Sequence, residues 1–229
     1  MDTVPYRMWA SYLLLLFSQQ DVHPKRILDV CCGTGTMCEL LDNEGFEMAG
    51  FDLSASMIDQ AREKAKHRIR PIRYEVMDAT EFEMGDTYDA AFSFFDSLNY
   101  ITDVDRLASA IKQVGKHVVR GGSFVFDLNT AFAFEAKLFD QRAKGPRSKV
   151  KYDWLGDYNP ETRIIRVDMT FWWQGHEYHE VHVQRAHTDD EVRAMLNEAG
   201  FTEIRCYESY TLNPPRAKSD RVHYTALKG

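Results

Sequence analysis

The chain has 229 residues, with 28 basic and 35 acidic side chains, and therefore a formal net charge of −7. This acidic balance argues against a broad phosphate-binding surface and so against nucleic acid as a partner. Hydrophobic residues make up 44% of the sequence, which is ordinary for a folded protein and excludes a disordered chain. The length suits one α/β domain with an elaboration, and we expect a single domain over residues 1–229.

Cysteine spacing and the apolar pattern indicate an intracellular protein. The four cysteines form neither a C-x-x-C pair nor a zinc-ligand spacing, so we expect reduced thiols and no metal site. The apolar run Met8–Phe17 is too short to span a bilayer and lacks the basic start of a signal peptide. We therefore predict a helix packed on a sheet, a cytoplasmic location and no membrane partner.

The first half of the chain alternates predicted strands with predicted helices. The strands are expected at 26–30, 46–51, 72–77, 88–94 and 123–128. The helices are expected at 36–43, after a cap at Ser54, and at 104–117. We interpret Gly121-Gly122 as the turn before the last of these strands. Such alternation is typical of a parallel sheet with helices on both faces.

From about Gly145 the hydrophobic pattern changes to a period of two, which indicates antiparallel strands joined by hairpins. These strands are predicted at 149–158, 163–173 and 177–187. Thr188-Asp189-Asp190-Glu191 then forms a capping box, at the start of a helix that stops at Gly200. Closing strands are expected at 201–211 and 221–227.

The turn after the first strand reads Asp29-Val30-Cys31-Cys32-Gly33-Thr34-Gly35. Glycine lets a backbone come close to a ligand and leaves amides free at the next helix N-terminus. A dinucleotide-binding fingerprint would carry a third glycine at position 38, where this chain has Cys38. A nicotinamide-dependent oxidoreductase therefore stays open as an alternative, although the turn fits it less well.

The segment Ile27–Gly35 resembles motif I of the class I S-adenosylmethionine-dependent methyltransferases, usually L-D-x-G-C-G-T-G, with Cys31 in place of a glycine. Segments 50–54, 77–79, 88–100 and 121–127 resemble later motifs of the same family in the right order. The resemblance covers roughly 20–130 and 188–227 and is closest to bacterial small-molecule members, including amino-sugar N-methyltransferases. It implies a Rossmann-like, seven-stranded, mostly parallel sheet with helices on both faces and an antiparallel β insertion after strand five.

The resemblance also implies which residues bind the cofactor, S-adenosyl-L-methionine. Asp52 ends the second strand, where a carboxylate would accept hydrogen bonds from both ribose hydroxyls. Met57 would lie on the adenine face, or would be a plain core residue, and Asp29 would contact the cofactor or only orient the turn. The full predicted set is Asp29, Cys31, Gly33, Thr34, Gly35, Asp52, Leu53, Met57, Asp78, Ala79, Phe94 and Phe95.

Candidate acceptor residues follow the fourth and fifth predicted strands, at the carboxyl edge where open α/β sheets bind ligands. Methyl transfer from a sulfonium is an in-line displacement that depends mainly on positioning, although a base can help remove a proton. Asp96 and Asn99 could instead cap a loop. The predicted catalytic residues are Asp96, Asn99, Tyr100 and His179, and the predicted substrate-binding residues are Asn129, His182 and Arg185.

Three histidines, at 176, 179 and 182, fall at steps of three on a predicted strand. Because side chains alternate across a strand, consecutive members point to opposite faces, which argues against a metal cluster. His179 and Arg185 share one face, whereas His182 shares the other with Gln184. We expect the antiparallel insertion, residues 145–187, to cover the acceptor site and supply most of its pocket.

The sequence thus predicts an enzyme that methylates a nitrogen or oxygen atom of a small molecule. A methyltransferase acting on RNA or protein is the first alternative, the oxidoreductase is the second, and a cofactor-binding protein without catalysis is a further one. The early aromatic residues Tyr6, Trp9 and Tyr12 are expected to form a shortened cover over the cofactor.

Overall fold

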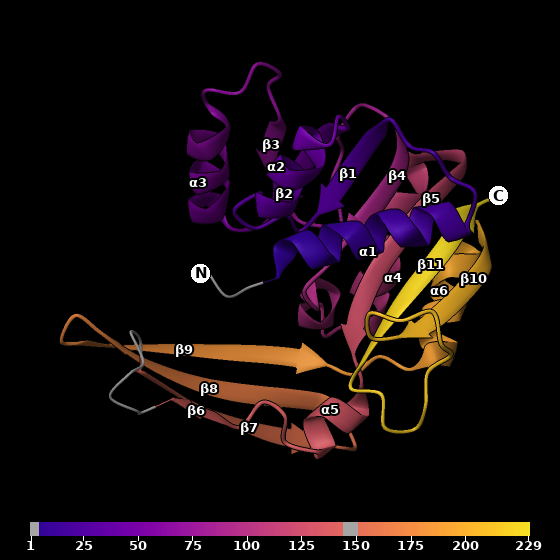
Figure 1. The fold of residues 1–229 in the computed structure, drawn as a ribbon. Coiled ribbons are helices and arrows are strands. Elements are labelled where there is room, and N and C mark those ends of the chain that lie inside the picture. The colour runs from indigo at the N-terminus through magenta and orange to yellow at the C-terminus, as the bar shows by residue number, and fades with distance from the viewer. Residues whose placement is uncertain (1–4, 144–150) are drawn as a thin grey trace.

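The computed structural model describes residues 5–143 and 151–229. Its centre is a seven-stranded sheet of order β10-β11-β5-β4-β1-β2-β3 (Figure 1). The strands are β1 (Arg26–Val30), β2 (Glu47–Asp52), β3 (Arg73–Val76), β4 (Tyr88–Ser93), β5 (Val118–Asn129), β10 (Phe201–Glu208) and β11 (Arg221–Lys228). Only β11 runs against its neighbours in this sheet. The predicted seven-stranded, mostly parallel sheet is therefore confirmed.

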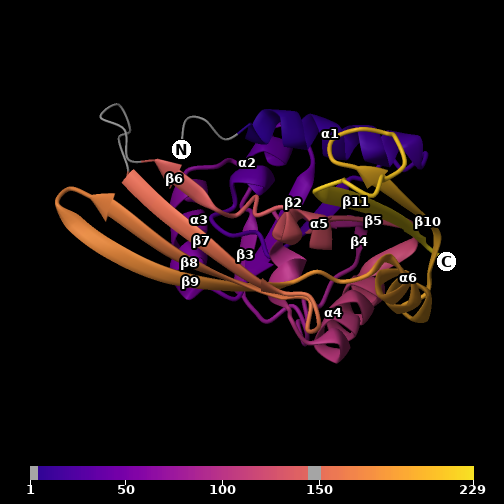
Figure 2. The same ribbon diagram turned by 90° about the horizontal axis from the view of Figure 1, so that it is seen from below.

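Helices cover both faces of this sheet, as predicted (Figure 2). One face packs against α1 (Tyr6–Gln19), α2 (Thr36–Asn43) and α3 (Ala55–Ala65). The other packs against α4 (Val104–His117) and α6 (Asp189–Glu198). Fully buried aliphatic and aromatic side chains fill both layers, and burial of this apolar surface is the main term that holds the layers together.

Local caps fix the starts of several helices. Ser54 accepts a hydrogen bond from the Met57 N–H at the start of α3. At the start of α6, Thr188 accepts from the Glu191 N–H while Glu191 accepts from the Thr188 N–H, so the predicted capping box is confirmed. Gly200 follows α6 with a φ of 81°, the left-handed conformation that ends many helices.

The glycine pair that was predicted to precede a strand lies within one instead. Gly121 and Gly122 lie inside β5, which already begins at Val118, so the interpretation as a turn was wrong. Pairing between β4 and β5 is irregular between Tyr88 and Ala90, and a Cβ at Gly122 would lie only 2.6 Å from the Asp89 carbonyl oxygen. Glycine therefore permits a bulge with close backbone approach at this point.

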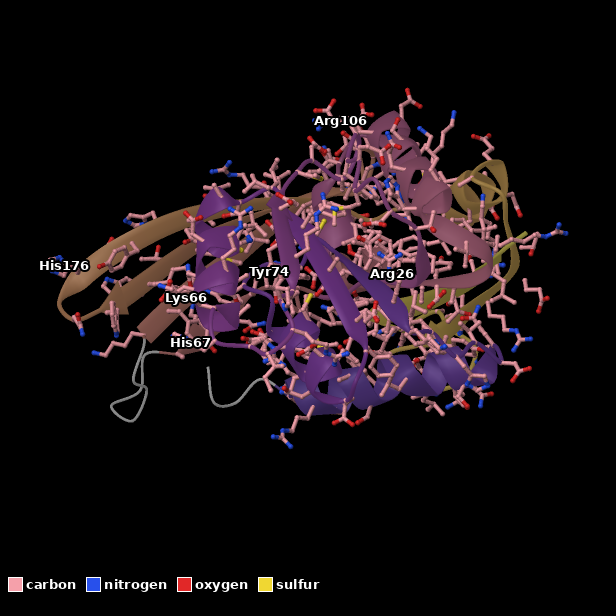
Figure 3. All side chains as sticks on the ribbon, turned by 90° about the horizontal axis from the view of Figure 1, so that it is seen from above. Arg26, Lys66, His67, Tyr74, Arg106 and His176 are labelled. Atoms are coloured by element: carbon pink, nitrogen blue, oxygen red, sulfur yellow. The ribbon has the colours of Figure 1, made fainter. Side chains whose placement is uncertain are left out.

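A second, antiparallel sheet of order β6-β7-β8-β9 follows β5. It contains β6 (Gln141–Ala143), β7 (Lys151–Asn159), β8 (Ile164–Trp173) and β9 (His176–Arg185). The start of the predicted first strand, residues 149–150, lies outside the described residues. Figure 1 shows this sheet beyond the carboxyl ends of β4 and β5, and Figure 3 shows His176 at the far end of its β8–β9 hairpin.

One face of the second sheet packs on α5 (Ala131–Glu135), a short helix that the sequence analysis did not anticipate. Ile165, Val167 and Met169 of β8 join Phe134 of α5 in a separate buried cluster. We call this side of the second sheet the inner face. In the part of the chain that the structure describes, no helix is long and apolar enough to cross a membrane.

Candidate active site

The turn after β1 keeps its backbone in the left-handed region. Cys31, Gly33 and Gly35 have φ values of 64°, 54° and 73°. A Cβ at Gly35 would collide with the Tyr74 ring, so packing against β3 accounts for that glycine. At Gly33 the nearest atom to a Cβ would be Met57 Sδ at 3.8 Å. Gly33 thus leaves open space beside the turn, which is where a ligand could approach the backbone.

Asp52, at the end of β2, holds this turn. Its Oδ2 accepts from the Gly33 N–H at 2.8 Å, and its Oδ1 accepts from the Ser54 N–H at 2.9 Å. A carboxylate oxygen has two lone pairs, so each oxygen of Asp52 keeps one for another donor. Beside it, the side chains of Leu53 and Met57 are 70% and 44% exposed. Two free acceptor sites therefore lie next to an uncovered apolar patch.

Asp78 lies beyond the end of β3. Its Oδ1 accepts from the N–H and the hydroxyl of Thr80, both at 2.8 Å, and its Oδ2 accepts from Arg106 at 2.7 Å. Partial burial opposes ionisation, but these hydrogen bonds and the Arg106 charge hold the pKa of Asp78 below its usual range. Arg106 comes from α4 (Figure 3). Ala79, next to Asp78, is buried.

Asp29 lies behind the turn instead of on its open side. It is buried, and its Oδ2 accepts from the Cys38 thiol at 3.3 Å. Burial raises its pKa well above the usual value. Among the two roles that the sequence left open, this position is compatible with orienting the turn.

The loop after β4 is strained. Phe95 and Asp96 both adopt left-handed backbone conformations, with φ values of 67° and 52°. Non-glycine residues in this region cost free energy and occur often at functional sites. Phe95 contacts Trp9 of α1, with ring centroids 4.3 Å apart. Trp9 also stacks on Tyr210, so Trp9 of α1 packs between this loop and the segment after β10.

Asp96 is the centre of a buried polar network. Its Oδ1 accepts from Arg221 at 2.7 Å, and its Oδ2 accepts from the Gln184 amide at 2.5 Å. Arg221 also pairs with Asp127, whose Oδ1 accepts from the Asp96 N–H at 3.1 Å. Burial raises the pKa of Asp96, an effect that the Arg221 charge opposes. Two carboxylates share one guanidinium here, which leaves excess negative charge when both are ionised.

Tyr100 and His182 also meet at this edge. The Tyr100 hydroxyl lies 2.6 Å from His182 Nδ1, and His182 Nε2 lies 3.2 Å from Glu180 Oε2. Tyr100 belongs to the short helix η1 (Ser97–Tyr100), whereas His182 and Glu180 project from the inner face of β9. Burial raises the pKa of Tyr100 to about 12, with the Asp96 charge adding to the effect.

Two of the candidate residues are committed to holding the backbone. Asn99 is fully buried; its amide donates to the carbonyls of Asn129 and Arg185 and accepts from the Asn129 N–H. The Asn129 side chain donates to Gln184 at 3.2 Å. This arrangement ties η1, β5 and β9 together and so fixes the second sheet against the carboxyl edge.

The other two candidates on β9 point away from His182, on the face that the alternation predicted. His179 is exposed and lies 2.8 Å from Glu177 Oε1. Arg185 donates to both oxygens of Glu191, at 2.8 and 3.0 Å. The structure therefore does not bring His179 and Arg185 together with His182. Arg185 is largely buried, and Glu191 of the capping box accepts its hydrogen bonds.

Gln184, Arg221 and Asp127 were not among the predicted site residues. Alternation along β9 placed Gln184 on the same face as His182. Asp127 is a charged residue inside an apolar strand, and such a residue needs a polar partner, which indicates a site. Arg221 carried no local signal, because its partner Asp96 is 125 residues away. Within residues 5–143 and 151–229, no group of three or more His, Cys, Asp or Glu side chains could hold a metal ion.

Comparison with known proteins agrees with this geometry. A methyltransferase domain family matches residues 27–122. A Geobacillus sp. protein described as a methyltransferase is 29% identical over 236 residues, covering all of this chain and 95% of that protein. An amino-sugar N,N-dimethyltransferase of Streptomyces venezuelae, acting on dTDP-3-amino-3,4,6-trideoxy-alpha-D-glucopyranose, is 30% identical over 122 residues, covering 53% of this chain and 50% of that enzyme.

Solved structures show the same fold. An S-adenosylmethionine-dependent methyltransferase from Clostridium acetobutylicum superposes with a TM-score of 0.89 at 22% identity, covering all of this chain and 94% of the other. An amino pentose methyltransferase from Micromonospora echinaspora, solved with S-adenosylmethionine bound, gives a TM-score of 0.79 at 20% identity, covering 100% and 93%.

Sheet order, motif positions and domain match together define a Rossmann-like methyltransferase. Residues 27–122 carry a methyltransferase domain, and the chain has the fold of the S-adenosylmethionine-dependent methyltransferases of solved structure. The methyltransferase domain and the Rossmann-like fold predicted from the sequence are confirmed.

Proposed function

We propose that this enzyme methylates an amine of a small molecule, at the carboxyl edge of the seven-stranded sheet. The observation that carries the proposal is the division of that edge into two chemically different halves. Over β1 and β2 lie Asp52, Leu53 and Met57, whereas over β4 and β5 lies the Asp96 network. Because β1 and β4 are neighbours in the sheet, the two halves adjoin.

The first half fits the donor. The two remaining acceptor sites of Asp52 match the two hydroxyls of a ribose, and the exposed Leu53 and Met57 side chains offer an apolar surface to adenine. Open space at Gly33 supports close approach of the ligand to the turn. Asp78 is ionised and can accept from the adenine amino group, sharing its carboxylate with Arg106. When bound, the cofactor supplies an electrophilic methyl group on a sulfonium.

The second half fits an amine acceptor. Asp96 and Asp127 share one guanidinium, that of Arg221, so when both are ionised the site is negative and favours a cationic ammonium group over a neutral hydroxyl. The inner face of the second sheet adds apolar walls near this charge, including Trp154 and Phe171. The relatives that methylate amino sugars also support an amine. The formal net charge of −7 also disfavours a nucleic-acid acceptor.

The candidate residues divide into two roles under this proposal. Tyr100, His182 and Asp96 face the acceptor, whereas Asn99 and Asn129 hold the loop and the second sheet in place. The assignment of His179 as catalytic and of Arg185 as substrate-binding has less support, since both lie on the opposite face of β9. The chain would act as one domain, and residues 151–187, the described part of the predicted insertion, would cover the acceptor site. The four free cysteines favour a cytoplasmic location.

Transfer of labelled methyl groups tests the proposal. Purified enzyme is incubated with methyl-labelled S-adenosylmethionine and either an ultrafiltered metabolite pool or RNA and protein from the same cells. We expect label in a small amine, identified by mass spectrometry. Label in RNA or protein alone would contradict the proposal.

A further inference from the structure

Tyr100, His182 and Glu180 form a chain of hydrogen bonds on the acceptor side. Holding the methyl donor and the acceptor in position does not require such a chain. Tyr100 contacts His182, and His182 contacts Glu180, which is largely exposed. They come from two elements far apart in the chain, η1 and β9. This chain of contacts begins at Tyr100, at the carboxyl edge of the seven-stranded sheet, and ends at the exposed Glu180.

The partners fix the direction of each hydrogen bond. A carboxylate can only accept, so the Glu180 contact places the imidazole proton of His182 on Nε2. Nδ1 then carries a lone pair and accepts from the Tyr100 hydroxyl at 2.6 Å. The oxygen lone pairs of Tyr100 stay available to a donor on the acceptor side. Gln184, two residues along β9 on the same face as His182, donates to Asp96, so the relay and the Asp96 network lie side by side.

We propose that Tyr100 and His182 form a proton relay that deprotonates the acceptor ammonium before methyl transfer, with Glu180 as its positioning residue. This inference rests on the proposed amine acceptor. The ammonium N–H gives its proton to the Tyr100 oxygen while the Tyr100 hydroxyl gives its own to His182 Nδ1. The acceptor becomes a neutral amine with a free lone pair, and the charge moves to an imidazolium paired with Glu180.

Under the proposed function, the network of Asp96, Asp127 and Arg221 binds the acceptor in its cationic form. An ammonium nitrogen has no lone pair and cannot attack a methyl carbon, so a proton must leave first. Asp96 is poorly suited to remove it, because protonating its carboxylate would weaken its ion pair with Arg221. Tyr100 is partly exposed on the same edge and leads outward.

The same strand offers a matched control. Glu177 pairs with His179 at 2.8 Å, much as Glu180 pairs with His182, but on the opposite face of β9 and without a tyrosine partner. Glu180→Gln and Glu177→Gln therefore make the same chemical change to two Glu–His pairs. Only the first alters the relay.

The first measurement needs neither cofactor nor acceptor. Nitrogen-15 chemical shifts of the free enzyme should show His182 with its proton on Nε2. In Glu180→Gln this preference should weaken, because an amide can donate as well as accept, while Glu177→Gln should leave His182 unchanged. A proton on Nδ1 in the unmodified enzyme would overturn the relay, whatever the substrate proves to be.

The second measurement follows label transfer from S-adenosylmethionine to the ultrafiltered metabolite pool across pH. At neutral pH, Tyr100→Phe should lower the rate about a hundredfold, the lower end of the range for proton-transfer catalysis. Glu180→Gln should lower it by less, because it removes only a positioning contact. Both defects should shrink towards about pH 10, where amines lose their proton unaided. The KM for S-adenosylmethionine should stay unchanged, as should the rate of Glu177→Gln.

The outcomes separate the relay from the function on which it rests. A normal rate in Glu180→Gln, or defects of equal size at every pH, would overturn the relay while leaving the methyltransferase proposal intact. Absence of label transfer to any small molecule by the unmodified enzyme would instead refute the proposed function.

Discussion

His223 of β11 is an unusual residue for a protein interior. It is fully buried against Tyr12, Phe94 and Tyr210, and neither ring nitrogen has a hydrogen-bond partner among the described residues. Burial lowers its pKa to about 3, and the nearby Arg221 charge acts in the same direction. An unpaired buried polar side chain costs about 1–3 kcal/mol. His223 is therefore a source of instability that grows in acid.

Replacing His223 by phenylalanine should stabilise the protein and flatten its acid response. Between pH 6.5 and about 3 the unfolded chain binds a proton that folded His223 does not, so the free energy of unfolding falls as pH falls. Urea unfolding of His223→Phe at pH 7 and 5 should show a smaller loss between the two values. His23→Phe, at an exposed position, is the control. An unchanged loss in His223→Phe would contradict this account of His223.

Residue-level prediction succeeded where the signal was local. Ser54 and Asp52 lie two residues apart, and a single short pattern predicted both the helix cap at Ser54 and the position of Asp52 at the end of a strand. Arg221 and Asp96 are far apart in sequence, and nothing in either neighbourhood identifies the other. Alternation predicted which β9 residues share a face, but it predicted neither which face meets the carboxyl edge nor the partners of each side chain.

At the scale of elements, Glu191 joins the second sheet to the seven-stranded one. Its carboxylate accepts from Arg185 at the end of β9 and from the Thr188 N–H at the start of α6. The hydrogen bonds from Arg185 lower the pKa of Glu191 to about 2. The stability that this ion pair provides is present above about pH 4.5, where the unfolded glutamate is also ionised, and it is lost as pH falls towards 2.

Glu191→Ala should therefore lower the free energy of unfolding by about 1–3 kcal/mol at pH 7, since it removes a helix cap and leaves Arg185 half-buried without its carboxylate. The difference from the unmodified protein should shrink as pH falls from 4.5 towards 2. Glu198→Ala, an exposed change at the other end of α6, should have little effect. Equal stabilities of the two variants at pH 7 would count against the role of this ion pair.

Long elements were predictable from hydrophobic period, and short ones were not. The strand at 26–30 and the helices at 36–43 and 104–117 match the structure to the residue. α5 and β6 have five and three residues, too few for either period to show. Gly121-Gly122 misled because a glycine pair marks a turn and a bulge equally well.

At the scale of the whole molecule, contacts with the seven-stranded sheet hold the antiparallel sheet in position. Asn99, Gln184 and the Tyr100–His182 pair are among its polar links to the carboxyl edge, and α5 supplies an apolar one. Family resemblance implied an insertion after strand five. The links themselves arise from side chains of η1, β5 and β9, and these become neighbours only in the folded chain.

The whole enzyme should work without a metal ion. Its predicted chemistry uses a sulfonium methyl donor and a proton relay, neither of which needs a Lewis acid. Methyl transfer should therefore keep its rate after dialysis against EDTA. Loss of turnover that a stoichiometric divalent ion restores would refute this prediction.

The central claim is that the edge around Asp52 binds S-adenosylmethionine. Calorimetry with S-adenosylhomocysteine tests it most directly, with Asp59→Ala as a matched loss of an exposed acid on α3. We predict binding by the unmodified enzyme and by Asp59→Ala, and binding weakened by about 1–3 kcal/mol in Asp52→Ala, the cost of losing hydrogen bonds to a charged group. Unchanged affinity in Asp52→Ala, or binding of NADH in place of S-adenosylhomocysteine, would contradict the account.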